Sequence, residues 1–141
     1  KMEGLRNEIV VLMGDGECHE GSVWEAAMLA SHHKLSNLIA IIDRNNQSVL
    51  DFIDNYNDVQ PLGAKFESFG WYVETVDGHN IQAIIDTLGI PESEHPFHPL
   101  VLIAKTVKGK GISFMEGVPE WHHKCPNKEH TEIARLELNG C

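Results

Sequence analysis

Four short apolar runs constrain the fold of this chain more than any other feature of its sequence. They occupy residues 9–13, 38–43, 71–76 and 100–104. Their length and their lack of alternation are typical of strands that are covered on both faces. Helical patterns occupy residues 22–33, 63–69, 81–88 and 131–138. This alternation predicts an α/β fold, with a doubly wound, mostly parallel sheet.

The size of the chain indicates a single unit. Its 141 residues, 42% of them hydrophobic, can bury one core of ordinary size, so we expect residues 1–141 to form one domain. The first residues lead directly into a strand with no leader pattern, and we expect the domain to be incomplete at its N-terminus. In the first helix, we expect Trp24, Met28 and Leu29 to be core residues.

Charge and cysteine content exclude several classes of function. The net charge of −10 argues against a nucleic-acid partner, which needs clustered Lys and Arg, and the longest basic cluster is residues 105–110. We expect no membrane partner, because no apolar run approaches the roughly 20 residues of a membrane span. The 3 cysteines are too few for a disulfide framework, which favours a cytoplasmic location.

Polar and glycine-rich segments follow every predicted strand. They are Gly14-Asp15-Gly16, Asp43-Arg44-Asn45-Asn46-Gln47, Asp77-Gly78-His79 and residues 105–111. In open parallel sheets, ligands bind outside the carboxyl ends of the strands. The sequence therefore predicts a ligand site at this edge of the sheet.

Asp15, Asn45 and Gln47 predict a metal at this edge. A carboxylate, an amide oxygen and the backbone carbonyl of Gln47 form the hard-oxygen set that Mg²⁺ or Ca²⁺ prefers, completed by ligand phosphates and water. Taken alone, Asp-Gly and Asn-Asn pairs are ordinary turn formers. Their occurrence after two strands of one βαβ unit favours the metal site.

Three stretches carry a resemblance to a known family. The segment VLMGDGECHEGSVWEAAMLASHHKLSNLIAIIDRNNQS resembles the thiamine-diphosphate motif, which opens with Gly-Asp-Gly and closes with Asn. The later GKG and EWHHKCPN are similar to transketolase, especially the form split into two subunits. The resemblance covers most of the chain and implies the diphosphate-binding domain of the thiamine-diphosphate-binding fold.

The resemblance assigns roles to individual residues. It implies that thiamine diphosphate is held at Gly14, Asp15, Gly16 and Asn45, partly through the metal. His122 matches the family histidine that touches both the diphosphate and the sugar, where an imidazole can donate a hydrogen bond or exchange a proton. The basic segment 105–110 shapes the loop that leads to this histidine, and a direct ligand contact from it stays open.

Glu20 has two interpretations. By resemblance, Glu20 and Glu25 lie near a dimer interface that links paired active sites, which makes Glu20 a cofactor-binding and catalytic candidate beside His122. In the structural alternative, Glu20 is a solvated charge, and Ser22 and Glu25 form a capping box at the start of the helix. For His79, the resemblance implies a structural role.

The implied reaction is the transfer of a two-carbon ketol unit from a ketose or its phosphate to an aldose or its phosphate. A second subunit or domain would carry the pyrimidine-binding site and the activating glutamate, so the chain alone would be inactive, and the enzyme would be a homodimer or heterotetramer. Residues 50–52 depart from the usual family pattern, which leaves the identity of the sugar open. Deoxyxylulose-phosphate synthase, or a non-catalytic subunit of the same fold, are the alternatives.

A zinc site is a further alternative. Soft ligands for it are present in the order Cys18, His19, His122, His123 and Cys125. Their spacing is not a paired CxxC signature, so we favour the thiamine-diphosphate interpretation. The histidines that match no motif are expected at the surface, and they are His32, His33, His95, His98 and His123.

Overall fold

A single parallel sheet forms the body of the molecule. The computed structural model describes residues 4, 7–47, 52–55 and 58–140, so Leu50 and Asp51 of the divergent loop lie outside the described residues. The strands are β1 (Ile9–Gly14), β2 (Leu38–Arg44), β3 (Tyr72–Asp77) and β4 (Leu100–Lys105), all paired in parallel in the order β1-β2-β4-β3. Each strand lies within a residue or so of its predicted place.

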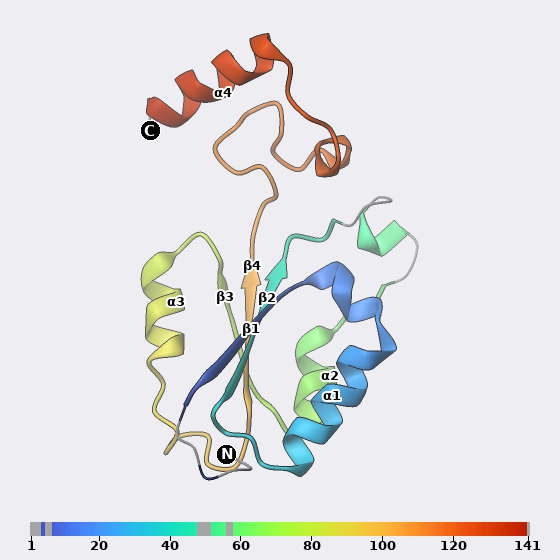
Figure 1. Ribbon diagram of the computed structural model, residues 1–141, viewed down its shortest axis with the longest axis vertical. Coiled ribbons are helices and arrows are strands. Elements are labelled where there is room, and N and C mark those ends of the chain that lie inside the picture. The colour runs from blue at the N-terminus through green and yellow to red at the C-terminus, as the bar shows by residue number, and fades with distance from the viewer. Residues whose placement is uncertain (1–3, 5–6, 48–51, 56–57, 141) are drawn as a thin grey trace.

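Helices cover both faces of this sheet. The helices α1 (Gly21–His32) and α2 (Leu62–Ser68) lie on one face and α3 (Ile81–Leu88) on the other, while α4 (Lys128–Asn139) lies beyond the carboxyl ends of the strands (Figure 1). The predicted doubly wound α/β fold is therefore confirmed. Short 3-10 turns are η1 (Asp15–His19), η2 (Ile53–Asn55) and η3 (Pro119–His122). Within the described residues, no helix has the length and apolar character needed to cross a membrane.

Two apolar layers hold the sheet between its helices. Phe66 of α2 is buried, with its ring centroid 5.2 Å from that of Trp24 and 5.3 Å from that of Trp71. Successive side chains of a strand point to opposite faces of the sheet. Ala40 of β2 therefore packs in the layer that contains Phe66, and Ile39 packs in the layer beneath α3. Both faces of the central strands are covered, as the continuous apolar runs predict.

The prediction for α1 is wrong at two positions. Met28 is 49% exposed and Leu29 57% exposed, because α1 turns the small side chains of Ala27 and Ala30 toward the core instead. Trp24 does pack against the core layer. The small residues Ala27 and Ala30 let the helix approach the sheet closely, and Met28 and Leu29 lie away from the core.

The start of α1 also differs from the predicted capping box. The helix begins at Gly21 with Glu20 as its N-cap residue, and no side chain caps it. Ser22 and Glu25 lie inside the helix and are both exposed. A capping box requires its first residue at the N-cap, so this pair cannot form one.

The strand β1 is not covered as predicted. It lies at one edge of the described sheet, and four consecutive side chains from Ile9 to Leu12 are 40% to 70% exposed. In β4, by contrast, the side chains of Leu100 to Ala104 are buried. The run of apolar residues predicted a strand covered on both faces, and within this chain that holds for the centre of the sheet but not for β1.

His95 is a further correction, because it is buried instead of lying at the surface. Its Nδ1 lies 3.0 Å from the carbonyl oxygen of His98, and its ring centroid is 5.5 Å from that of Tyr72. A buried imidazole needs partners for its polar atoms, and the backbone supplies one here.

Candidate cofactor site

Asp15 is the most enclosed polar side chain at the carboxyl ends of the strands. It follows β1 directly and is 1% exposed. Its Oδ2 accepts a hydrogen bond of 2.6 Å from the backbone N–H of Asn46 and lies 3.6 Å from Nη1 of Arg44. Burial raises the pKa of the Asp15 carboxyl group, against the lowering effects of the Asn46 hydrogen bond and the Arg44 charge. Asp15 thus links the loops after β1 and β2.

The other oxygen of Asp15 is unsatisfied. Within the described residues, Asp15 Oδ1 is buried and has no hydrogen-bond partner, and the same is true of Oε1 of Gln47. Buried polar atoms in native proteins are nearly always paired with protein, water or a bound group. Unsatisfied oxygen atoms in the loops after β1 and β2 are the kind of donor that a hard cation prefers, so the residues present suit the predicted metal.

Asn45 is oriented by its neighbours. Its Nδ2 donates to Oδ2 of Asp43 over 3.1 Å, and its Oδ1 accepts from the N–H of Gln47 over 3.0 Å. A carbonyl oxygen has two lone pairs, so Oδ1 keeps one for a further partner. The left-handed backbone of Asn46, with φ of 61°, turns the chain so that its N–H faces Asp15. The metal-ligand roles of Asp15, Asn45 and Gln47 remain predictions.

The conformation of Gly14 does not require glycine. Its φ is −78°, an ordinary value, and an added Cβ would meet nothing closer than Oε2 of Glu17 at 3.7 Å. The local backbone therefore does not explain the presence of glycine at this position. Close approach of a ligand to the backbone of Gly14-Asp15-Gly16 stays a prediction.

His122 lies in η3, within the segment that follows β4. This segment lies beyond the carboxyl ends of the strands, at the same end of the sheet as the loops after β1 and β2 (Figure 1). Nδ1 of His122 is 2.7 Å from Nζ of Lys108. Because an ammonium group can only donate, Nδ1 is the acceptor and the ring proton is on Nε2. Burial lowers the pKa of His122, and the charges of Lys108 and His123 lower it further. The hydrogen bond from Lys108 requires a neutral imidazole, which leaves Nε2–H as a donor.

The candidate residues form separate local clusters at this end of the molecule. Asp15 is held by Arg44 and Asn46, whereas His122 is held by Lys108. Glu20 is exposed at the junction of η1 and α1, where its N–H donates to the carbonyl oxygen of Glu17 over 2.9 Å. The roles of Glu20 and His122 toward a ligand stay predictions.

Sequence reasoning placed Arg44 and Lys108 in the segments at the strand ends but missed their contacts with Asp15 and His122. Arg44 directly precedes Asn45, and the need of a buried carboxylate for a cation could have indicated its pairing with Asp15. Lys108 is part of the basic segment, but its contact with His122 depends on how the chain folds back after β4. No local pattern in the sequence encodes that return.

The zinc alternative is wrong. No group of three or more His, Cys, Asp or Glu side chains among the described residues could hold a metal ion, and all five residues of the alternative are described. Cys18 is buried, and burial raises the pKa of its thiol to about 11, which disfavours the thiolate that zinc requires. Cys125 is exposed.

The chain is an α/β domain with unsatisfied buried oxygen atoms at its strand ends, which form a candidate ligand site, and with His122 at the same end of the sheet. Residues 2–139 match the family described as transketolase, thiamine diphosphate binding domain. The chain belongs to this family. The predicted resemblance to transketolase is confirmed, and the description of the family names thiamine diphosphate, the cofactor that the sequence predicts.

Curated relatives include components of split transketolases. One of the subunits of apulose-4-phosphate transketolase from Actinobacillus succinogenes is 47% identical over 139 residues, which are 98% of this chain and 49% of that protein. The 6-deoxy-6-sulfo-D-fructose transketolase subunit SqwG from Clostridium sp. is 36% identical over 142 residues, 99% of this chain and 51% of that protein. The chain thus spans about half the length of these relatives.

Solved structures agree with the fold. The crystal structure of transketolase from Campylobacter jejuni matches with a TM-score of 0.86 and 30% identity, over 96% of this chain and 21% of that one. The parallel sheet and its helices are therefore those of a transketolase, of which this chain corresponds to a part.

Proposed function

We propose that this chain supplies the metal and diphosphate site of a transketolase-type enzyme, which transfers a two-carbon ketol unit from a ketose to an aldose. The observation that carries the proposal is the buried Oδ1 of Asp15, which has no partner while Oδ2 is held by Asn46 and Arg44. A divalent cation, most simply Mg²⁺, would occupy that position with Asn45 and the backbone carbonyl of Gln47 as further ligands.

The protein residues position the cofactor, and thiamine diphosphate supplies the carbon–carbon bond chemistry when bound. Asp15 and Asn45 hold the cation that neutralises the diphosphate, and the backbone of Gly14 and Gly16 lets the phosphates approach closely. His122 offers its Nε2–H to a phosphate oxygen or to an oxygen of the sugar. Glu20, exposed at the start of α1, faces a neighbouring subunit.

The substrates are ketoses with an anionic group. The two named relatives act, by their names, on apulose 4-phosphate and on 6-deoxy-6-sulfo-D-fructose, which carry a phosphate and a sulfonate. A screen of ketose phosphates and sulfonates against a common aldose acceptor identifies the donor. Turnover of neutral ketoses alone would contradict this assignment.

A second subunit or domain completes the active site. The apolar side chains of β1 are largely exposed, whereas parallel strands are normally covered on both faces. The two named relatives are about twice as long as this chain. The remaining part of the enzyme therefore packs on β1, and the pyrimidine-binding site with its activating glutamate lies in that part or in a partner subunit.

Calorimetric titration tests the cofactor site. Thiamine diphosphate is titrated, with and without Mg²⁺, into the complete enzyme with either wild-type chain or Asp15→Asn. The Asn variant retains an acceptor for the Asn46 N–H but loses the carboxylate charge. We expect metal-dependent binding that weakens at least about tenfold, or roughly 1.4 kcal/mol, in the variant.

A matched control separates the site from general effects of charge. Asp86→Asn removes a carboxylate from the exposed side of α3, where its partner is Gln82. We expect the control to bind like the wild type. A folded, complete assembly that binds no thiamine diphosphate would overturn the enzyme proposal and favour a non-catalytic transketolase-fold subunit.

A further inference from the structure

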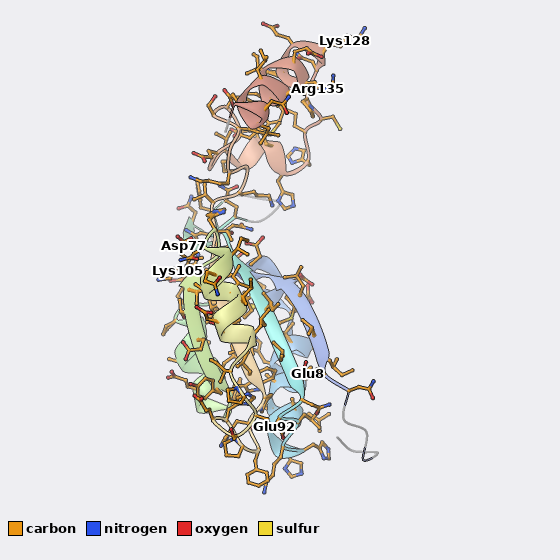
Figure 2. The ribbon with its side chains drawn as sticks, turned by 90° about the vertical axis from the view of Figure 1, so that its left-hand side faces the viewer. Glu8, Asp77, Glu92, Lys105, Lys128 and Arg135 are labelled. Atoms are coloured by element: carbon orange, nitrogen blue, oxygen red, sulfur yellow. The ribbon has the colours of Figure 1, made fainter. Side chains whose placement is uncertain are left out.

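His79 connects the loops that follow β3 and β4. Its Nε2 accepts a hydrogen bond of 2.8 Å from the backbone N–H of Val107. The two strands are neighbours in register, with Asp77 opposite Lys105, and Figure 2 shows these two residues close together at the carboxyl end of the sheet. Backbone pairing between β3 and β4 ends at Asp77 and Lys105, and beyond this point the side chain of His79 connects the two loops.

The turn before His79 fixes its position. Oδ1 of Asp77 accepts from the N–H of His79 over 2.9 Å, and the N–H of Gly78 donates to the carbonyl oxygen of Lys105 over 2.7 Å. A Cβ at Gly78 would lie 2.5 Å from Cγ2 of Thr106, so only glycine lets the loops approach this closely. The ring of His79 is therefore presented to Val107 from an anchored turn.

Val107 directly precedes Lys108, whose ammonium group donates to Nδ1 of His122. The backbone of Lys108 makes a further contact, because its carbonyl oxygen accepts a hydrogen bond of 2.9 Å from the N–H of Gly117. The backbone around Lys108 is thus held at Val107 by His79 and at Lys108 itself by Gly117. Loss of the hydrogen bond between His79 and Val107 would release the backbone that directly precedes Lys108.

We infer that His79 is a positioning residue of the cofactor site, which holds Val107 so that Lys108 reaches His122 and fixes the tautomer of that ring. The inference rests on the proposed role of His122 toward the diphosphate and sugar. It also assigns opposite tautomers to the two neutral rings. His79 must leave Nε2 unprotonated to accept from Val107, whereas His122 leaves Nδ1 unprotonated to accept from Lys108.

Two substitutions test the inference in the complete enzyme. His79→Phe keeps a ring of similar shape but removes the acceptor, and His79→Gln supplies an amide oxygen at a similar reach that can accept from Val107. We expect His79→Phe to speed hydrogen exchange of the Val107 amide and to shift the ¹⁵N signals of His122 toward a mixture of tautomers. We expect His79→Gln to retain both wild-type signatures.

Cofactor kinetics provide a second measurement. We expect His79→Phe to raise the KM for thiamine diphosphate about tenfold, the equivalent of roughly 1.4 kcal/mol, and His79→Gln to restore it to within about twofold. Thermal unfolding of both variants reports whether the fold is intact. An unchanged His122 tautomer in a folded His79→Phe, or a His79→Gln as impaired as His79→Phe, would overturn the inference.

The NMR measurements need no cofactor, so the two proposals can fail separately. If the wild-type enzyme binds no thiamine diphosphate but the His122 tautomer depends on His79 as expected, the proposed function fails, and only the control of the His122 tautomer by His79 stands. If the cofactor binds and the tautomer is independent of His79, the positioning role fails and the proposed function stands.

Discussion

The ionisation of His122 is set by its immediate surroundings. Its pKa lies below the ordinary histidine value, so the unfolded chain binds the proton more readily than the folded one. Stability linked to this ring is therefore complete above the ordinary histidine pKa and is lost as pH falls from there toward the lower folded value. The ring stays a neutral donor in a pH range where a free histidine is partly charged.

Substitution of Lys108 changes this balance. We predict that Lys108→Met raises the pKa of His122, though not fully, because burial is the largest cause of the shift and remains. An NMR titration of the His122 ring measures the change. Lys110→Met is the control, because Nζ of Lys110 lies 3.3 Å from Oε1 of Glu116 and pairs with that carboxylate. An equal shift in both variants would contradict a specific effect of Lys108.

The cysteines provide a second prediction at the scale of residues. Cys18 is buried with its thiol pKa raised to about 11, whereas Cys125 is exposed. Alkylation requires an accessible thiolate. We predict that a brief iodoacetamide pulse at pH 8 labels Cys125 and leaves Cys18 unmodified until urea unfolds the protein, as measured by peptide mass mapping. Labelling of Cys18 in the folded protein would contradict the buried position.

At the scale of elements, α3 and α4 begin with the same cap but differ in what they contact. Oδ1 of Asn80 accepts from the N–H of Ala83 over 3.1 Å, and Oδ1 of Asn127 accepts from the N–H of His130 over 2.8 Å. In α3, Ile84 packs against the core layer of the sheet, whereas α4 buries no residue. The same substitution should therefore have different consequences.

We predict that Asn80→Ala lowers the free energy of global unfolding by about 1 kcal/mol, the usual effect of losing an N-cap. Asn127→Ala should loosen α4 locally and leave the urea midpoint of the sheet unchanged, because few contacts couple α4 to the core. Urea titration measures the first effect, and hydrogen exchange of α4 amides the second. Equal shifts of the urea midpoint would show that α4 unfolds together with the sheet.

Sequence patterns predicted the strands well where both faces of the strand are buried. Parallel strands covered on both faces must be apolar throughout, so β2 and β4 stand out without knowledge of the fold. The helix α4 was predicted from residue 131 but begins at Lys128, because its start depends on the Asn127 cap. For α1, the apolar residues did not reveal that the alanines, instead of Met28 and Leu29, face the core.

The candidate site was predictable to a similar extent. Asp15 and Asn45 could be predicted because each directly follows a strand, and the carboxyl ends of parallel strands lie at the same edge of the sheet. Local sequence is enough to recognise a residue in such a position. The pairing of Asp15 with Arg44 and that of Lys108 with His122 depend on register and on the return of the chain after β4. Such contacts between distant segments leave no periodic signal in one sequence.

At the scale of the whole molecule, β1 presents an apolar surface on the α3 side of the sheet. Val10 and Leu12 pair with Ile39 and Ile41 and so face the side on which Ile84 packs. They remain largely exposed. Contiguous exposed apolar residues mark protein contacts, which agrees with the proposal that the remaining part of the enzyme covers β1.

Substitution on β1 tests that coverage. We predict that Leu12→Gln weakens binding of the complementary subunit by a factor of about ten or more, or roughly 1.4 kcal/mol, because a polar amide would be buried there without a partner. Leu136→Gln on α4 is the matched control, since Leu136 is 73% exposed and Leu12 70%. Sedimentation of the mixed subunits measures the affinity. If both halves belong to one polypeptide, the same pair of variants is compared by thermal midpoint. A Leu12→Gln variant that associates as tightly as Leu136→Gln would contradict the assignment, because a side chain covered by the rest of the enzyme cannot become polar without consequence.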